Sequence, residues 1–189
     1  MLEFDYDEEK AMEAISYLIS KTNEKKMGVL YLIKFLYFAE RRCLREHNFP
    51  IVGGHYYSLP NGPVVSQILD SLKSESLQGN NTFSRYFRRV SKDIILKEEK
   101  SLAKLSQVEL KIYDQVYMDL YDYSPKELVG YCHDQELVPE WVNPGESSVQ
   151  IEPGTLLKIL GKSSEEIQQI AEMLAESRSI AAFSRKYEA

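Results

Sequence analysis

Two cysteines and three histidines are the residues with which this chain could build a metal site. Cys43 and His47 are four residues apart, so both side chains would point from one face of a helix. Together with Cys132 and His133 they would supply two sulfur and two nitrogen ligands, a set that zinc accepts. However, adjacent residues on a helix diverge, and neither pair has the spacing of common zinc sites. We therefore predict no metal site and no cofactor, with buried thiols and hydrogen-bonded histidines.

A cysteine nucleophile is the second chemistry to consider. It would need a base within hydrogen-bond reach and a third group that orients the base. His133 directly follows Cys132, so the two side chains would not face each other on a helix, and nothing in the sequence brings His55 to a thiol. Phosphate-binding glycine loops and the common zinc-protease and hydrolase motifs are absent from the sequence. We predict no catalytic residue and a protein that is not an enzyme; an enzyme built on His55, His133 and a cysteine or carboxylates is the least favoured alternative.

The net charge of the chain is −6, which bears on its partners. An acidic chain is repelled by phosphate backbones, so direct binding to nucleic acid is disfavoured. A transcriptional regulator is disfavoured too, because no helix-turn-helix with a basic second helix is apparent. Two groups of basic residues are expected to be solvated helix or strand faces. They are Arg41, Arg42 and Arg45, and Arg85, Arg88, Arg89 and Lys92.

Length and hydropathy favour one domain in the cytoplasm. The chain has 189 residues, of which 43% are hydrophobic, enough for a single well-packed core. The first ten residues are acidic, unlike the basic start of a signal peptide. The most apolar stretch, residues 27–39, is shorter than the roughly 20 residues that cross a bilayer. We predict a single domain over residues 1–189, a cytoplasmic location, reduced thiols and no membrane contact.

Helical spacing of apolar residues dominates the sequence and predicts a mainly α fold. Helices are expected over residues 6–21, 24–46, 106–120, 124–133, 152–160 and 163–186, with another that begins at Pro63. Residues 27–39 are apolar on nearly every side, which is typical of a central, fully buried helix. The charged residues that follow, 40–46, are expected to emerge into solvent.

Short extended segments are predicted between the helices. Residues 55–59, 93–98 and 149–151 have strand character, and residues 83–90 suit either a short helix or a strand. The sequence PNGP at residues 60–63 is a dense turn signal. The fold class is therefore mainly α (α+β): a single compact helical domain around a buried central helix, with a small β element.

Three segments combine unusual residues in a distinctive order. They are KFLYFAE at residues 34–40, PIVGGHYY at 50–57 followed by NGPV at 61–64, and LVGYCH at 128–133 followed by PEW at 139–141. Together they resemble the SocA-like antitoxin family, also called the Panacea domain. The resemblance extends over about residues 27–160 and leaves the helix at 163–186 outside it.

The resemblance implies a binding protein without a catalytic mechanism or a cofactor. Members of the family are antitoxins of bacteria and phages that neutralise a cognate toxin protein, often the product of the adjacent gene. The implied partner is therefore a toxin, and the implied mechanism is direct protein–protein interaction. One branch of the family delivers its toxin to a protease, so a proteolytic adaptor with a protease as second partner is the alternative.

The same segments give the candidate partner-binding residues. We expect contacts with the toxin near the glycine-proline turn and the tyrosines that precede it, because a rigid turn loses little entropy on binding. The candidates are Tyr56, Tyr57, Asn61, Gly62, Pro63, Val64, His133 and Trp141. The other interpretation is that Gly62, Pro63 and Trp141 only stabilise the fold.

Overall fold

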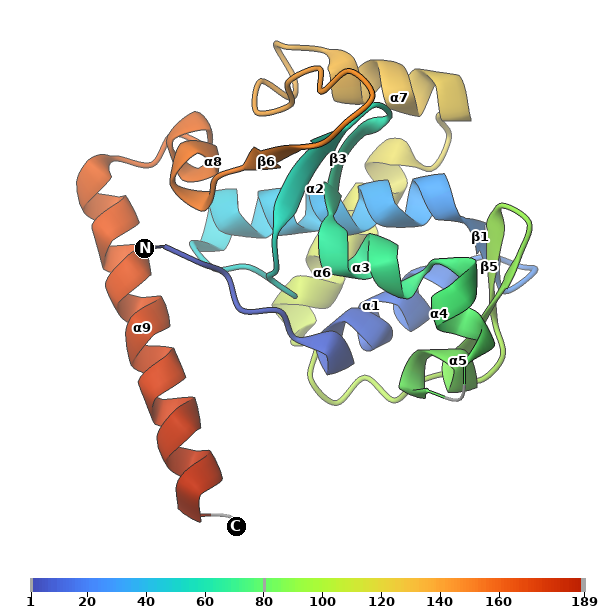
Figure 1. Ribbon diagram of the computed structural model, residues 1–189, viewed down its shortest axis with the longest axis horizontal. Helices are drawn as coiled ribbons and strands as arrows, with labels where there is room; N and C mark the ends of the chain where they lie inside the picture. Colours follow the sequence, from blue (N-terminus) through green and yellow to red (C-terminus); the bar gives the residue numbers. More distant parts are fainter. Residues whose placement is uncertain (1, 80, 188–189) are drawn as a thin grey trace.

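The computed structural model describes the backbone of residues 2–79 and 81–187, and their side chains except those of residues 74 and 184–187. Helices form most of the fold, and two small antiparallel sheets lie beside them (Figure 1). The helices are α1 (Glu8–Ser20), α2 (Val29–His47), α3 (Ser66–Ser71), α4 (Ser74–Gln78), α5 (Thr82–Tyr86), α6 (Gln107–Leu120), α7 (Pro125–His133), α8 (Pro153–Ile159) and α9 (Ser164–Tyr187). The strands are β1 (Lys26–Gly28), β2 (Tyr56–Leu59), β3 (Gly62–Val65), β4 (Phe87–Val90), β5 (Asp93–Leu96) and β6 (Val149–Ile151).

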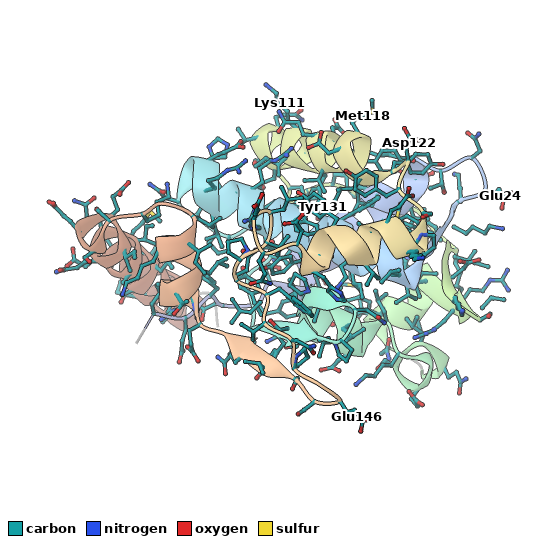
Figure 2. All side chains as sticks on the ribbon, turned by 90° about the horizontal axis from the view of Figure 1, so that it is seen from above. Glu24, Lys111, Met118, Asp122, Tyr131 and Glu146 are labelled. Carbon is teal, nitrogen blue, oxygen red and sulfur yellow. The ribbon has the colours of Figure 1, made fainter. Side chains whose placement is uncertain are left out.

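Helix α2 is the centre of the molecule, as the sequence predicts. Residues 32–40 are all buried, and α1, α6, α7 and β3 pack around the helix. Seen from above, α7 lies across α2 (Figure 2). Within the described part of the chain, no helix combines the length and the apolar character needed to span a bilayer.

The predicted start of the central helix is wrong. A helix was expected from Glu24, but residues 26–28 form β1, which pairs with β5 so that Lys26 lies opposite Ile95. The chain reverses direction just before this strand, where Lys25 has a φ angle of +47°. Pairing with a strand about 70 residues away therefore overrides the local helical pattern, and α2 begins only at Val29.

The prediction that a helix begins at Pro63 is also wrong. Pro63 lies in β3, opposite Ser58 of β2. The sheet has the order β3-β2-β6, so β3 is an edge strand, where a residue without an N–H group is tolerated. The helix that follows, α3, begins three residues later at Ser66. The turn predicted at residues 60–63 is confirmed: Pro60 and Asn61 connect β2 to β3, and Gly62 and Pro63 begin β3.

Other predicted elements are confirmed. Strands form at residues 56–59, 93–96 and 149–151, and residues 83–90 are divided between α5 and β4. Capping boxes close the first turns of α6 and α9 through Ser106 with Glu109 and Ser163 with Glu166. Figure 1 shows the second half of α9 extending away from the other helices. Its first half is packed through Ile170, which is 3% exposed.

Candidate partner-binding surface

Glu40 on α2 holds the loop that leads into β2. Its Oε1 atom accepts the N–H of Val52 at 2.7 Å, and its Oε2 atom accepts the N–H groups of Ile51 and Gly53 at 3.1 and 3.2 Å. The hydroxyl of Tyr56 donates to the same Oε2 atom at 3.0 Å. The side chain is 0% exposed, so the prediction that residues 40–46 emerge into solvent is wrong at Glu40. These four donors satisfy a buried carboxylate and fix the loop in one conformation.

Lys34 is a second buried polar anchor on α2. It is 0% exposed, and its ammonium group donates to the carbonyl of Pro63 at 2.8 Å. Burial lowers the pKa of Lys34 to about 8, because desolvation disfavours the charged form. The lysine therefore attaches β3 to the central helix through a backbone carbonyl.

The hairpin turn, residues 59–62, is held from its other side by α7 and the loop after it. His133 Nε2 lies 2.9 Å from the carbonyl oxygen of Pro60, and Trp141 Nε1 donates to the carbonyl of Leu59 at 2.9 Å. The two rings are stacked with centroids 4.0 Å apart. In addition, the N–H of Val142 donates to the hydroxyl of Ser58 at 3.2 Å. The turn is therefore fixed by contacts to its backbone on both flanks.

Glu140 connects the loop after α7 to the central helix. Its Oε1 atom accepts the Tyr37 hydroxyl at 2.9 Å and Arg41 Nε at 2.6 Å. Arg41 also donates to the carbonyl of Leu137 at 3.0 Å. Glu140 is 5% exposed, so this ion pair is shielded from water and its geometry is well defined. The three segments singled out in the sequence thus meet around one hairpin.

The predicted partner-binding residues are brought together, but they differ in exposure. Tyr56, Gly62, Pro63, Val64 and Trp141 are buried. The remaining candidates offer surface: Asn61 is exposed, and Tyr57 and His133 are half-buried. Binding of a partner by these residues stays a prediction, and the buried members would act by positioning the exposed ones.

Two exposed valines next to the hairpin were missed by sequence reasoning. Val142 is 46% exposed and adjoins Ser58 through its backbone, and Val149 is 41% exposed and lies opposite Ser58 in the ladder between β2 and β6. We refer to the solvent-accessible side chains that adjoin the hairpin as the hairpin surface; they are Tyr57, Asn61, His133, Val142 and Val149. No periodicity signal could have identified the valines, because both lie in or beside irregular loops.

The cysteine and histidine side chains considered for metal and nucleophile chemistry do not converge on one site in the described part of the chain. Cys43 and Cys132 are 0% exposed, and burial raises the pKa of Cys132 to about 11. A thiol with a raised pKa is a poor nucleophile and metal ligand. His133 is directed at the Pro60 carbonyl rather than at a thiol. Among the described residues, no group of three or more histidine, cysteine, aspartate or glutamate side chains could hold a metal ion.

Ion pairs involve the arginines of the first basic group and Arg85 of the second. Arg41 pairs with Glu140, and Arg42 pairs with Asp119 at 2.6 Å. In the second group, Arg85 pairs with Glu98. Arg42 and Arg85 agree with the interpretation as protein surface, whereas Arg41 pairs with the buried Glu140 and departs from it.

Comparison with protein families gives a match to this chain. The family model described as "Antitoxin SocA-like, Panacea domain" matches residues 32–141, which is more than half of the chain. The matched stretch contains all the side chains that hold the hairpin, from Lys34 and Glu40 on α2 to Trp141. Neither the curated proteins nor the solved structures contain a match to the chain.

Proposed function

Because the chain belongs to the SocA-like Panacea antitoxin family, we propose that it neutralises a cognate toxin protein by binding it directly. A role related to toxin–antitoxin systems follows from the family itself. The finer statement, neutralisation by direct contact with a toxin encoded by the adjacent gene, is our proposal. The observation that carries it is that the family match covers the segments that converge on one rigid hairpin.

The hairpin surface suits a partner-binding role. The turn is already held by Trp141, His133 and Lys34, so little conformational entropy remains to be lost when a partner binds. A stable interface of standard size removes about 1,600 Å² from water, and a few central residues dominate its energy. Val142 and Val149 supply apolar area, and Asn61 and His133 supply polar groups, the mixture found in such interfaces.

A proteolytic adaptor is the second candidate, and one observation favours it. An adaptor must bind its client and a protease at the same time, which requires two surfaces. Helix α9 lies outside the matched residues and exposes apolar side chains in both of its halves: Met173 is 43% and Ile180 is 61% exposed. This helix could supply the second surface, whereas direct neutralisation would not require it.

A growth assay tests direct neutralisation. The adjacent open reading frame is expressed alone, with the wild-type chain, and with Val142→Asp or Asn61→Ala variants. We expect the wild type to restore growth and Val142→Asp to lose rescue, because a charge desolvated in an interface weakens binding by about tenfold or more. Val108→Asp is the matched control: Val108 is 44% exposed on α6, away from the hairpin surface.

Two outcomes of this assay would count against the proposal. If the neighbouring gene is not toxic, the cognate partner is not encoded there. If Val142→Asp and Val108→Asp rescue growth equally well, the hairpin surface is not the site of contact. Rescue that disappears when α9 is removed or when the host protease is deleted would favour the adaptor.

A further inference from the structure

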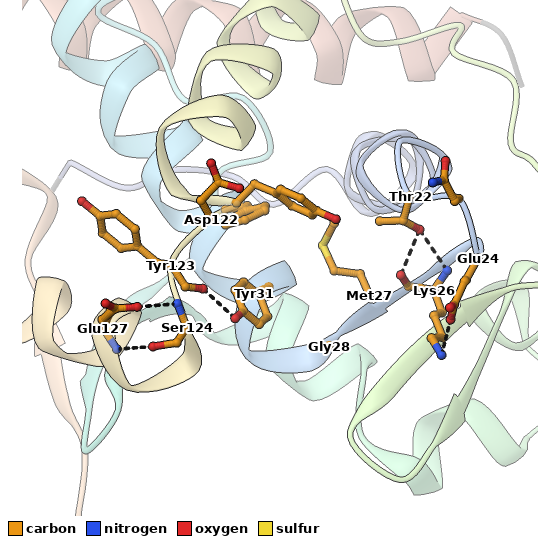
Figure 3. A pocket seen from close by; sticks show the side chains of 13 residues that line it. Thr22, Glu24, Lys26, Met27, Gly28, Tyr31, Asp122, Tyr123, Ser124 and Glu127 are labelled. Atoms are coloured by element: carbon orange, nitrogen blue, oxygen red, sulfur yellow. Dashed lines mark hydrogen bonds and ion pairs between the residues drawn. The ribbon is translucent and has the colours of Figure 1, made fainter.

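A pocket of about 690 Å³ lies at the end of the molecule where α2 begins (Figure 3). Its walls come from the connection between α1 and β1, from the first turns of α2, and from the connection between α6 and α7. From above, Glu24 and Asp122 appear at this same end (Figure 2). The volume is in the range of sites that bind small molecules or inserted side chains. No residue of the hairpin surface lines this pocket.

The pocket is shaped before any ligand arrives. The hydroxyl of Tyr31 donates to the carbonyl of Tyr123 at 2.7 Å and connects α2 to the α6–α7 connection. On the opposite wall, the Thr22 hydroxyl bonds to the carbonyl of Lys26 at 2.9 Å. Ser124 and Glu127 form the capping box that begins α7. Figure 3 shows these bonds around the opening. A preformed pocket binds with a smaller entropy loss than one that must be ordered.

The charges of the lining favour a cation. Three carboxylates line the pocket, those of Glu24, Asp122 and Glu127, against one ammonium group, that of Lys26. Lys26 forms an ion pair with Glu24, so Asp122 and Glu127 remain without a cationic partner among the described residues. Hydrogen bonds from Ser124 lower the pKa of Glu127, which therefore stays ionised at neutral pH. An anionic ligand would be repelled, whereas a cation would offset the charges of the two carboxylates that have no cationic partner.

The aromatic side chains of the pocket have the chemistry to stack on a cation. Tyr31, Phe35, Tyr121 and Tyr123 line it. Tyr121 is stacked on Tyr117 with centroids 4.6 Å apart. The chain already places an ammonium group on this stack, because Lys21 Nζ lies 5.9 Å from the Tyr117 ring centroid. It also lies 4.4 Å from the centroid of Tyr17. Cation–π contacts of this kind contribute about 0.5–2 kcal/mol each.

We propose that this pocket binds the guanidinium or ammonium group of an arginine or lysine side chain that the toxin inserts. The preference of the pocket for a cation rests on the charges and aromatic rings of its lining, and the identity of the donor rests on the proposed function. Helix α7 supports a shared partner, since Glu127 in its first turn lines the pocket and its last residue, His133, belongs to the hairpin surface. Nine helical residues extend about 13 Å, so one interface of standard size reaches both places.

Binding of a free guanidinium compound to the full chain tests the pocket without the toxin. Agmatine is titrated while amide chemical shifts are followed by NMR, with butylurea as the uncharged probe. We expect saturable shifts at Tyr31, Tyr121 and Glu127, with a dissociation constant on the order of 1 mM, and none with butylurea. Asp122→Asn should weaken agmatine binding about fivefold or more, whereas Glu176→Gln, the same charge change on exposed α9, should leave it unchanged.

The affinity of the chain for the toxin is the second measurement of the test. If the toxin inserts a cation, Asp122→Asn weakens the toxin complex about tenfold and Glu176→Gln does not. Absence of saturable agmatine binding would overturn the cation pocket, whatever the toxin does. Agmatine binding with unchanged toxin affinity in Asp122→Asn would overturn the assignment of the cation to the toxin. Agmatine binding without any toxin complex of the wild type would contradict the proposed function and leave the pocket standing.

Discussion

Replacing Gly62 by alanine is expected to lower the free energy of unfolding by about 3 kcal/mol or more. Gly62 begins β3 with a φ angle of +100°, a backbone conformation that strains any residue with a Cβ atom. A Cβ atom would also lie 2.4 Å from Cys132 Cβ and 3.1 Å from Lys34 Nζ. The hairpin would have to move away from α7, so the contacts of His133 and Trp141 with the turn should loosen as well.

Gly130→Ala is the matched control for this substitution. Gly130 lies on α7, and an added Cβ atom would meet nothing within 4 Å. Alanine is the better helix former, so this variant should be more stable than the wild type by up to about 1 kcal/mol. Urea unfolding followed through the fluorescence of Trp141, the single tryptophan, measures both variants. If Gly62→Ala and the wild type are equally stable, the hairpin does not pack closely against α7.

The second large effect is expected for Glu40→Gln. In either orientation of the new amide, an NH₂ group would face at least one of the N–H groups of Ile51, Val52 and Gly53. A buried donor left without an acceptor costs about 1–3 kcal/mol, so we expect a loss of about 2 kcal/mol at neutral pH. Residues 51–53 should also exchange their amide hydrogens faster. Glu46→Gln, on the exposed end of the same helix, should change stability by less than about 0.5 kcal/mol.

The pH dependence of stability gives Glu40 a separate signature. Burial raises the pKa of its carboxyl group from the usual 4.5 to about 7, against the opposing effect of its four hydrogen-bond donors. Between these pH values the folded chain keeps a proton that the unfolded chain releases. This contribution to stability is therefore complete below pH 4.5 and is lost as the pH rises to about 7. Glu40→Gln does not titrate, so parallel stability curves of both proteins across this range would contradict the assignment.

The buried central helix was predictable because its apolar residues surround the helix axis, a pattern that only burial on all sides explains. The burial of Glu40 was not predictable. Glu40 directly follows the apolar stretch and precedes two arginines, a pattern typical of the exposed end of a helix. Its donors lie 11 to 16 residues further along the chain. Only the folded loop brings them to the carboxylate.

Long-range pairing explains the other differences from the sequence prediction. The helical pattern that starts at Glu24 competes with the pairing of β1 and β5, whose partners are about 70 residues apart. Glu13 on α1 is a comparable case. Its carboxylate is 2% exposed and accepts backbone N–H groups of Lys104 and Leu105, which no local pattern indicates.

For the candidate site, the sequence predicted which segments come together, but it missed Val142 and Val149 and did not predict the exposure of the residues it named. Residues 50–64 and 128–141 carry a recognisable pattern, and the structure places both around one hairpin. Tyr56 was expected near the partner, yet its hydroxyl bonds to Glu40 inside the core. A tyrosine is equally compatible with a core edge and with an interface, so its type could not decide. The pocket beside Tyr31 arises from three separate segments and had no sequence signal.

Co-purification of the chain with the product of the adjacent gene tests direct neutralisation most simply. Both proteins are co-expressed, one is captured by an affinity tag, and the eluate is analysed by size-exclusion chromatography. We predict a stable complex in which both chains are present in fixed proportion, which survives with Val108→Asp and is lost with Val142→Asp. Restored growth without any complex, when the host proteases are absent, would contradict neutralisation by direct binding.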